Sequence, residues 1–169
     1  MRATTMAGAG DDAPGKNNYP NEYARPQRTV AEAIQLVLAT LDVKALKPLS
    51  PEATSPASQA RALLVLLLNC YVHQIYSSKV AANLAARDPE FPWLWWENFP
   101  DARALRRFRE ENLTVLRACL TVVLRLLAEQ KIMAGTLTKI NAAQLAEEAN
   151  RRITMAAFAD AVEPNRSQI

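Results

Sequence analysis

The stretch from Ser58 to Tyr76 is the most apolar part of the chain and constrains the fold more than any other segment. Its centre, from Ala62 to Leu68, reads Ala-Leu-Leu-Val-Leu-Leu-Leu, so a helix built from it carries apolar side chains on every face. A helix of this kind must be enclosed by other elements. The run is far shorter than the roughly 20 residues that cross a bilayer. It therefore predicts the central buried helix of a soluble protein with no membrane partner.

The rest of the chain repeats apolar residues with the period of a helix, and no stretch alternates as a strand does. The chain holds only 4 glycines, and its many Ala and Leu residues favour helices. We predict an all-α protein, a compact domain of about five to six helices. Besides the central helix, the predicted helices begin at the cap residue Thr29 with a capping box to Glu32, at the cap residue Ser77, at the cap residue Asp101, at Leu113 and at Thr138.

The predicted domain organisation has three parts. Residues 1–28 contain Gly, Pro, Asn and Asp without apolar periodicity and are expected to form a flexible N-terminal arm. Residues 29–163 form a single helical domain, and residues 164–169 form a tail. The end of the arm is basic, with Lys16, Arg25 and Arg28. The arm either lies as a strap along DNA or along a protein partner, or it is an ordinary flexible terminus.

The cysteines, the histidine and the net charge restrict the class of protein. Cys70 and Cys119 lie in apolar helical stretches without CxxC spacing, which is typical of reduced core residues in a cytoplasmic protein. His73 is the only histidine and has no cluster of ligands around it, so no metal or other cofactor is expected. The net charge of +3 permits binding to nucleic acid but does not require it.

Four arginines follow a helix-start signal between Pro100 and Asn112. Asp101 is the expected cap, and Leu105 and Phe108 are expected to face the core together. The rest of the helix surface would then carry a cationic face that suits a polyanion, formed by Arg103, Arg106, Arg107 and Arg109.

A second interpretation of this helix involves no ligand. Glu110 and Glu111 follow Arg106 and Arg107 by four residues, a spacing that also predicts exposed ion pairs of little energetic value.

All 3 tryptophans lie between Trp93 and Trp96. Aromatic rings of this kind either stack on bases or fill a hydrophobic cleft. Glu90 and Glu97 surround them with negative charge, which favours packing over stacking. A protein partner would dock through the Trp93–Trp96 segment or through the N-terminal arm.

Four segments in a fixed order carry a resemblance to a known family. They read Leu63-Leu-Val-Leu-Leu-Leu, Tyr76-Ser-Ser-Lys-Val-Ala, Arg87-Asp-Pro-Glu-Phe-Pro-Trp-Leu and Pro100-Asp-Ala-Arg-Ala-Leu-Arg-Arg-Phe-Arg. Over about residues 30 to 130 the chain resembles the N-terminal domain of bacterial insertion-sequence transposases of the InsH type. Gln74 stands where that family usually has a glycine, and Ala102 and Arg103 replace its usual histidine and small hydroxyl residue.

The resemblance implies a module of helix-turn-helix character that binds double-stranded DNA. By position, the short helix after Ser77 would support the helix from Asp101 to Glu111, which would enter the major groove. The candidate DNA contacts are Arg103, Arg106, Arg107, Arg109, Lys79 and Ser78.

The resemblance also bears on catalysis. Transposases of this kind cut DNA with three metal-binding carboxylates, the DDE residues, on a separate domain. We expect that domain to be absent here, and Asp160 and Glu163 to have no partners, so this chain is not expected to be an enzyme. The alternative function is a helical protein–protein interaction or structural subunit built on the same scaffold, and a homodimer is a further alternative.

Overall fold

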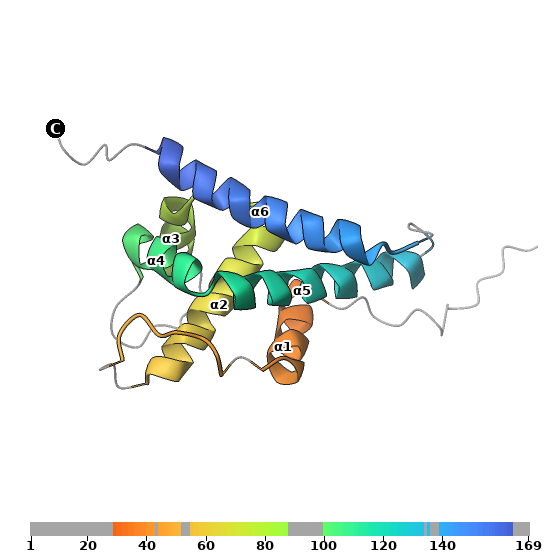
Figure 1. Cartoon of the computed structure of the whole chain (residues 1–169), viewed down its shortest axis with the longest axis horizontal. Helices are drawn as coiled ribbons and strands as arrows, with labels where there is room; N and C mark the ends of the chain where they lie inside the picture. Colours follow the sequence, from red (N-terminus) through yellow and green to blue (C-terminus); the bar gives the residue numbers. More distant parts are fainter. Residues whose placement is uncertain are drawn as a thin grey trace, which may run out of the picture.

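The computed structural model describes residues 29–42, 44–51, 55–87, 100–133, 135 and 139–163, and every regular element in these ranges is an α-helix (Figure 1). The helices are α1 (Val30–Thr40), α2 (Pro56–Val72), α3 (Ser78–Arg87), α4 (Ala102–Glu111), α5 (Leu113–Met133) and α6 (Ala142–Val162). The all-α prediction is therefore confirmed. The N-terminal arm (1–28), the Trp93–Trp96 segment and the tail (164–169) lie outside the described residues.

Side chains at the predicted caps begin three of the helices. The hydroxyl of Thr29 accepts a hydrogen bond from the backbone N–H of Glu32 at 3.2 Å, and the Glu32 carboxylate accepts from the Thr29 N–H at 2.7 Å. Asp101 and Ser77 each accept from the N–H three residues further on, at 2.7 Å and 3.3 Å. Each cap satisfies an amide that has no partner within its helix, so all three predicted caps are confirmed.

The start of α6 differs from the prediction. The helix begins at Ala142 rather than at Thr138, because the side chain of Asn141 accepts hydrogen bonds from the first two N–H groups after Ala142, at 3.0 and 3.3 Å. Asparagine is a stronger cap than threonine.

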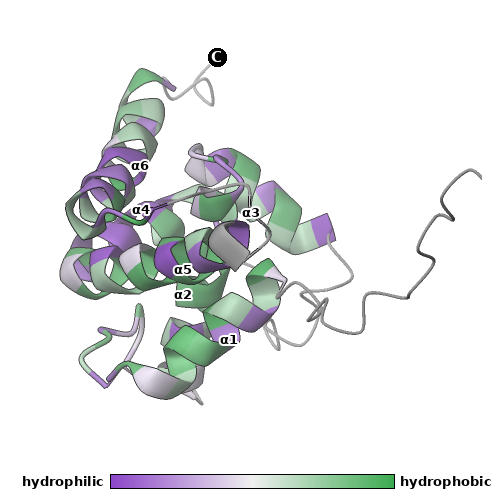
Figure 2. Ribbon diagram, turned by 90° about the vertical axis from the view of Figure 1, so that its right-hand side faces the viewer, coloured by the Kyte–Doolittle hydropathy of each residue, from purple (hydrophilic) through white to green (hydrophobic). Residues whose placement is uncertain are grey.

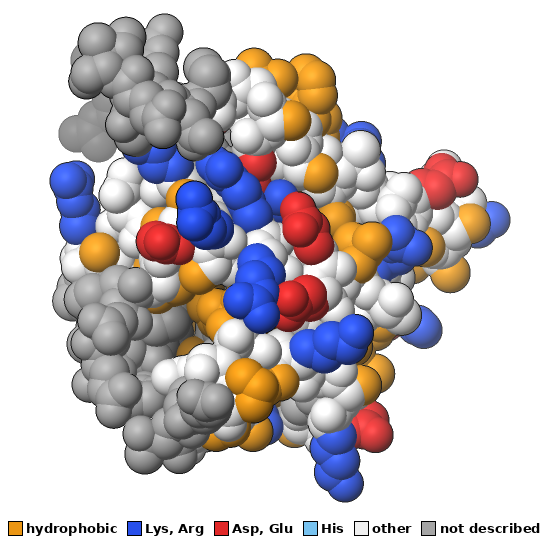
Figure 3. Space-filling view, turned by 60° about the vertical axis from the view of Figure 1, so that its left-hand side comes forward, with side chains coloured by type: hydrophobic (Ala, Val, Ile, Leu, Met, Phe, Trp, Pro, Cys, Tyr) orange, Lys and Arg blue, Asp and Glu red, His pale blue; other side chains and the backbone are white. Residues whose placement is uncertain are grey.

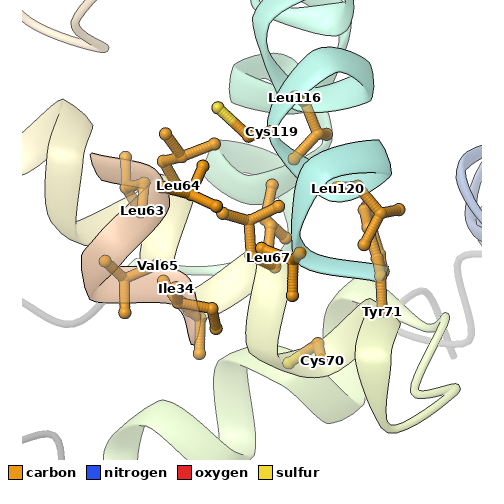
Figure 4. Close-up of a cluster of buried hydrophobic side chains, with 14 of the residues drawn as sticks. Ile34, Leu63, Leu64, Val65, Leu67, Cys70, Tyr71, Leu116, Cys119 and Leu120 are labelled. Carbon is orange, nitrogen blue, oxygen red and sulfur yellow. The ribbon is translucent and has the colours of Figure 1, made fainter. Parts of the chain in front are cut away.

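Helix α2 is the central helix, as its sequence predicts. It packs against α1, α3, α4 and α5, and all seven residues from Ala62 to Leu68 are buried. Figure 4 shows Leu64 and Leu67 of α2 beside Leu116 and Leu120 of α5. Burial of large aliphatic side chains stabilises the fold by about 1.5–3 kcal/mol each.

Both cysteines belong to the same core. Cys70 and Cys119 are buried and form no disulfide. Burial raises the pKa of the Cys70 thiol to about 12 and that of Cys119 to about 11, because a thiolate is poorly solvated in an apolar interior. The prediction that both are reduced core residues is confirmed.

Helix α2 ends in a turn that requires left-handed backbone. The N–H of Ile75 donates to the carbonyl of Cys70 at 2.8 Å, and the N–H of Gln74 donates to the carbonyl of Tyr71 at 3.2 Å. These two bonds form a Schellman motif, and Gln74 at its left-handed position has a φ of 60°. This is the position at which the transposase family usually has glycine. The turn forms here without it and directs the chain into α3.

Helices α3 and α4 pack together at one end of the molecule, and the C-terminal end of α6 runs past them (Figure 1). Residues 88–101 connect the two helices. A helix-turn-helix motif joins its helices with a turn of three or four residues. The two helices are thus adjacent in space but are not joined as in that motif, and the prediction of a helix-turn-helix unit is not confirmed.

Candidate functional site

The packing of α3 against α4 brings the six predicted contact residues to the same end of the molecule, but in different environments. Lys79 of α3 and Arg103 and Arg107 of α4 are exposed. Arg106 is partly buried, with a third of its side chain accessible. The remaining two, Arg109 and Ser78, are only 4% and 2% exposed. Four of the six residues can therefore reach a ligand at the surface.

The expectation that Arg109 faces outward with the other arginines is wrong. Leu105 and Phe108 are fully buried, as predicted. Arg109 follows Leu105 by four residues, so the helical period places it on the same inner side. The spacing of these three residues indicates the inner position of Arg109, although the charge of its side chain indicates the surface.

Arg109 is buried because it pairs with a carboxylate from α6. One of its terminal nitrogens, Nη2, lies 2.7 Å from Oδ2 of Asp160, and its other terminal nitrogen, Nη1, donates to the hydroxyl of Ser78 at 3.3 Å. Ser78 in turn donates to Asp160 twice, from its backbone N–H at 2.9 Å and from its hydroxyl at 2.6 Å. The expectation that Asp160 has no partners is therefore wrong, since its carboxylate joins α3, α4 and α6.

The charged form of Asp160 is favoured in this cluster. Burial by itself raises the pKa of a carboxyl group, but the hydrogen bonds from Ser78 and the positive charge of Arg109 outweigh it and hold the pKa of Asp160 below its usual range. A buried ion pair is stable only when further hydrogen bonds satisfy its remaining polar atoms. Ser78 supplies those bonds.

Glu163, just beyond α6, also has a partner. Its carboxylate accepts a hydrogen bond from the hydroxyl of Ser77, with oxygen–oxygen distances of 2.9 and 3.0 Å. The expectation that Glu163 is unpaired is wrong as well. Both acidic side chains at the end of α6 thus meet the N-terminus of α3, where a helix dipole favours negative charge.

The ion-pair interpretation of the arginine helix holds for one of its two predicted pairs. Nε of Arg107 lies 2.8 Å from the Glu111 carboxylate, and the Arg107 side chain is 59% exposed. Nε of Arg106 instead lies 3.5 Å from Oδ1 of Asp160, so this arginine turns to α6 rather than to Glu110.

The surface at this end carries cations from two helices. Figure 3 shows Lys and Arg side chains gathered on this side of the molecule, with Asp and Glu side chains between them. Lys79 and Arg87 come from α3, and Arg103 and Arg107 come from α4. Arg87 was not among the predicted contacts. It lies in the last turn of α3, where a cation complements the helix dipole.

Two kinds of site are not found among the residues that the structure describes. No group of three or more His, Cys, Asp or Glu side chains in these ranges could hold a metal ion. In the same ranges, no helix combines the length and the apolar character needed to cross a membrane.

Comparisons with models of protein families, with curated proteins and with solved structures find no match to this chain. The likeness to insertion-sequence transposases therefore depends on the four sequence segments alone.

Proposed function

We propose that the protein binds double-stranded DNA through the exposed cations of α3 and α4. The observation that carries this proposal is the placement of Lys79, Arg87, Arg103 and Arg107 on two helices that pack together. Each Lys or Arg that neutralises a phosphate releases condensed counterions, which favours association with a polyanion. The order of segments shared with insertion-sequence transposases supports the same conclusion.

The contacts we propose are mainly to phosphate rather than to bases. The Arg107–Glu111 pair is exposed and of little energetic value, so Arg107 can exchange Glu111 for a phosphate at little cost. While Asp160 is bound to them, Arg109 and Ser78 hold α4, α3 and α6 together from within. Contacts to phosphate fix the orientation of a protein on a duplex and carry no sequence information directly. We propose binding without a catalytic step.

The test is fluorescence anisotropy with a labelled duplex, measured over a series of salt concentrations. The double variant R103A/R107A is expected to weaken binding and to reduce the slope of log K against log salt by about 0.9 for each phosphate that the variant no longer neutralises. The matched control is R117A/R125A on α5. Both of these residues are exposed, and Arg125 pairs with Glu129 at 3.1 Å as Arg107 pairs with Glu111. The absence of binding at low salt, or an equal decrease in affinity in both variants, would contradict the proposal.

A second candidate function is a helical protein–protein interaction. Met155, Phe158 and Val162 are large apolar residues spaced three and four apart on α6, and all are exposed, Phe158 to 61%. Figure 2 shows that α6 becomes hydrophobic toward its C-terminal end. Aligned exposed apolar side chains mark contact surfaces.

Light scattering of the purified chain separates the two functions. A dimer that F158E converts to a monomer, together with no affinity for DNA, would favour the second candidate. A monomer that binds DNA would favour the first.

A further inference from the structure

The contacts of Asp160 define a set of donors that converges on one anion. The backbone N–H and the hydroxyl of Ser78 and the guanidinium of Arg109 all lie within hydrogen-bond distance of its carboxylate, and Arg106 lies 3.5 Å away. None of these donors belongs to α6, the helix that carries Asp160. A helix N-terminus combined with arginines is also the arrangement by which proteins bind phosphate.

Tyr71 provides an independent indication that this cluster contains a donor that the Asp160 carboxylate does not satisfy. Its side chain is almost completely buried, and its hydroxyl has no hydrogen-bond partner. The hydroxyl lies beside the guanidinium of Arg109 and near the carboxylate of Asp160, but its geometry completes a hydrogen bond with neither. Buried polar groups almost always have partners. A phosphate has more acceptor oxygens than a carboxylate and can serve a further donor.

We propose that Ser78, Arg106, Arg109 and Tyr71 form an oxyanion site for a phosphate group, and that Asp160 fills this site from within. The C-terminal half of α6 then competes with a phosphate for the site. If the phosphate belongs to DNA, the inference rests on the proposed function. If the ligand is free phosphate, the inference does not depend on that function.

The exchange is physically accessible because it replaces one anion with another. Removal of Asp160 alone would leave Arg109 as an unpaired buried charge, which is costly. An incoming phosphate keeps the arginines neutralised and keeps the Ser78 donors bonded. The second contact of α6 with this end of α3, between Glu163 and Ser77, is exposed and can be replaced by water.

The site is tested by anion rescue of D160A. Thermal unfolding is followed in increasing sodium phosphate and in sodium chloride of equal ionic strength. Phosphate at ten times its dissociation constant is expected to raise the folding equilibrium constant of D160A about 11-fold, whereas chloride does not. E163A is the matched control, because removal of the Glu163 carboxylate leaves unpaired only the exposed hydroxyl of Ser77. The same titration on D160N covers the case in which D160A does not fold. Equal effects of phosphate and chloride on the variant that folds would overturn the proposal.

The competition is tested in the unmodified protein by amide hydrogen exchange. Residues 154–162 of α6 are expected to exchange faster in phosphate than in chloride of equal ionic strength, and faster again with a DNA duplex. Unchanged or slower exchange of these amides in phosphate would overturn the competition. Rescue of D160A by phosphate in a protein without affinity for DNA would support the oxyanion site and would reject the proposed function instead.

Discussion

Replacement of Arg109 by methionine is the most direct probe of the cluster at the end of α6. Methionine keeps the length of the side chain and much of its apolar packing, but it removes the partner that lies 2.7 Å from Asp160. Both side chains of the pair are only 4% exposed, so the carboxylate would remain buried with Ser78 as its main donor. Loss of one member of a buried ion pair costs about 3–5 kcal/mol. This is a large part of the roughly 5–15 kcal/mol that stabilises a typical domain.

The pH dependence of this variant follows from the lowered pKa of Asp160. A carboxyl whose pKa is lower in the folded state contributes stability above its unfolded pKa of roughly 3.9, and this stability is lost as the pH falls through the folded pKa. In R109M the main positive charge is absent, so this contribution shrinks. The difference in stability between the wild type and R109M is therefore expected to be largest near pH 7 and to decrease below about pH 4.

The assay is urea unfolding followed by far-UV circular dichroism at several pH values, with the slope m compared between variants to verify two-state behaviour. R107M is the control, because it removes an exposed ion pair of similar distance and is expected to cost no more than about 1 kcal/mol. The double variant R109M/D160L, which removes both charges, is expected to recover most of the lost stability. A cost for R109M no larger than that of R107M, or independent of pH, would contradict a stabilising role for the buried Arg109–Asp160 pair.

Three further predictions concern local features of the fold. Q74G is expected to raise the melting temperature, because left-handed backbone costs a non-glycine residue about 1–2 kcal/mol, whereas the conformational entropy that glycine loses on folding costs only about 0.5–1 kcal/mol. G135A, at a φ of 74°, is expected to lower the melting temperature for the same reason. Calorimetry that shows equal shifts for the two variants would contradict this explanation. N112A is expected to lower the free energy of unfolding in urea by about 1–3 kcal/mol, because the buried Asn112 amide forms two hydrogen bonds, at 2.7 and 3.0 Å, with the backbone of Lys47 before α2. N141A, at an exposed cap, is expected to lower it by about 1 kcal/mol. Cys70 and Cys119 are expected to resist a thiol reagent at pH 8 in the folded protein and to react promptly in urea, because burial raises the pKa of each; rapid labelling of the folded protein would show that the core opens easily.

The features that the sequence predicted correctly are local or apolar. Thr29, Ser77 and Asp101 cap their helices through atoms three residues away, so the sequence alone contains both partners. The run from Ala62 to Leu68 is apolar on every face, and it is buried whichever helices surround it. The Arg107–Glu111 pair is local as well, because its members lie one helical turn apart.

The roles of Ser78, Arg109 and Asp160 were decided by tertiary structure. Arg109 and Ser78 are 31 residues apart, and Ser78 and Asp160 are 82 residues apart, so no spacing rule joins them. An arginine within an amphipathic helix pattern is assigned to the surface because burial of an unpaired charge is prohibitive. Only the docking of α6 supplies the carboxylate that makes its burial possible. Local hydrogen bonds and apolar burial thus follow from the sequence itself. Whether a charged side chain is buried or exposed depends instead on which distant partner the packing of the helices places beside it.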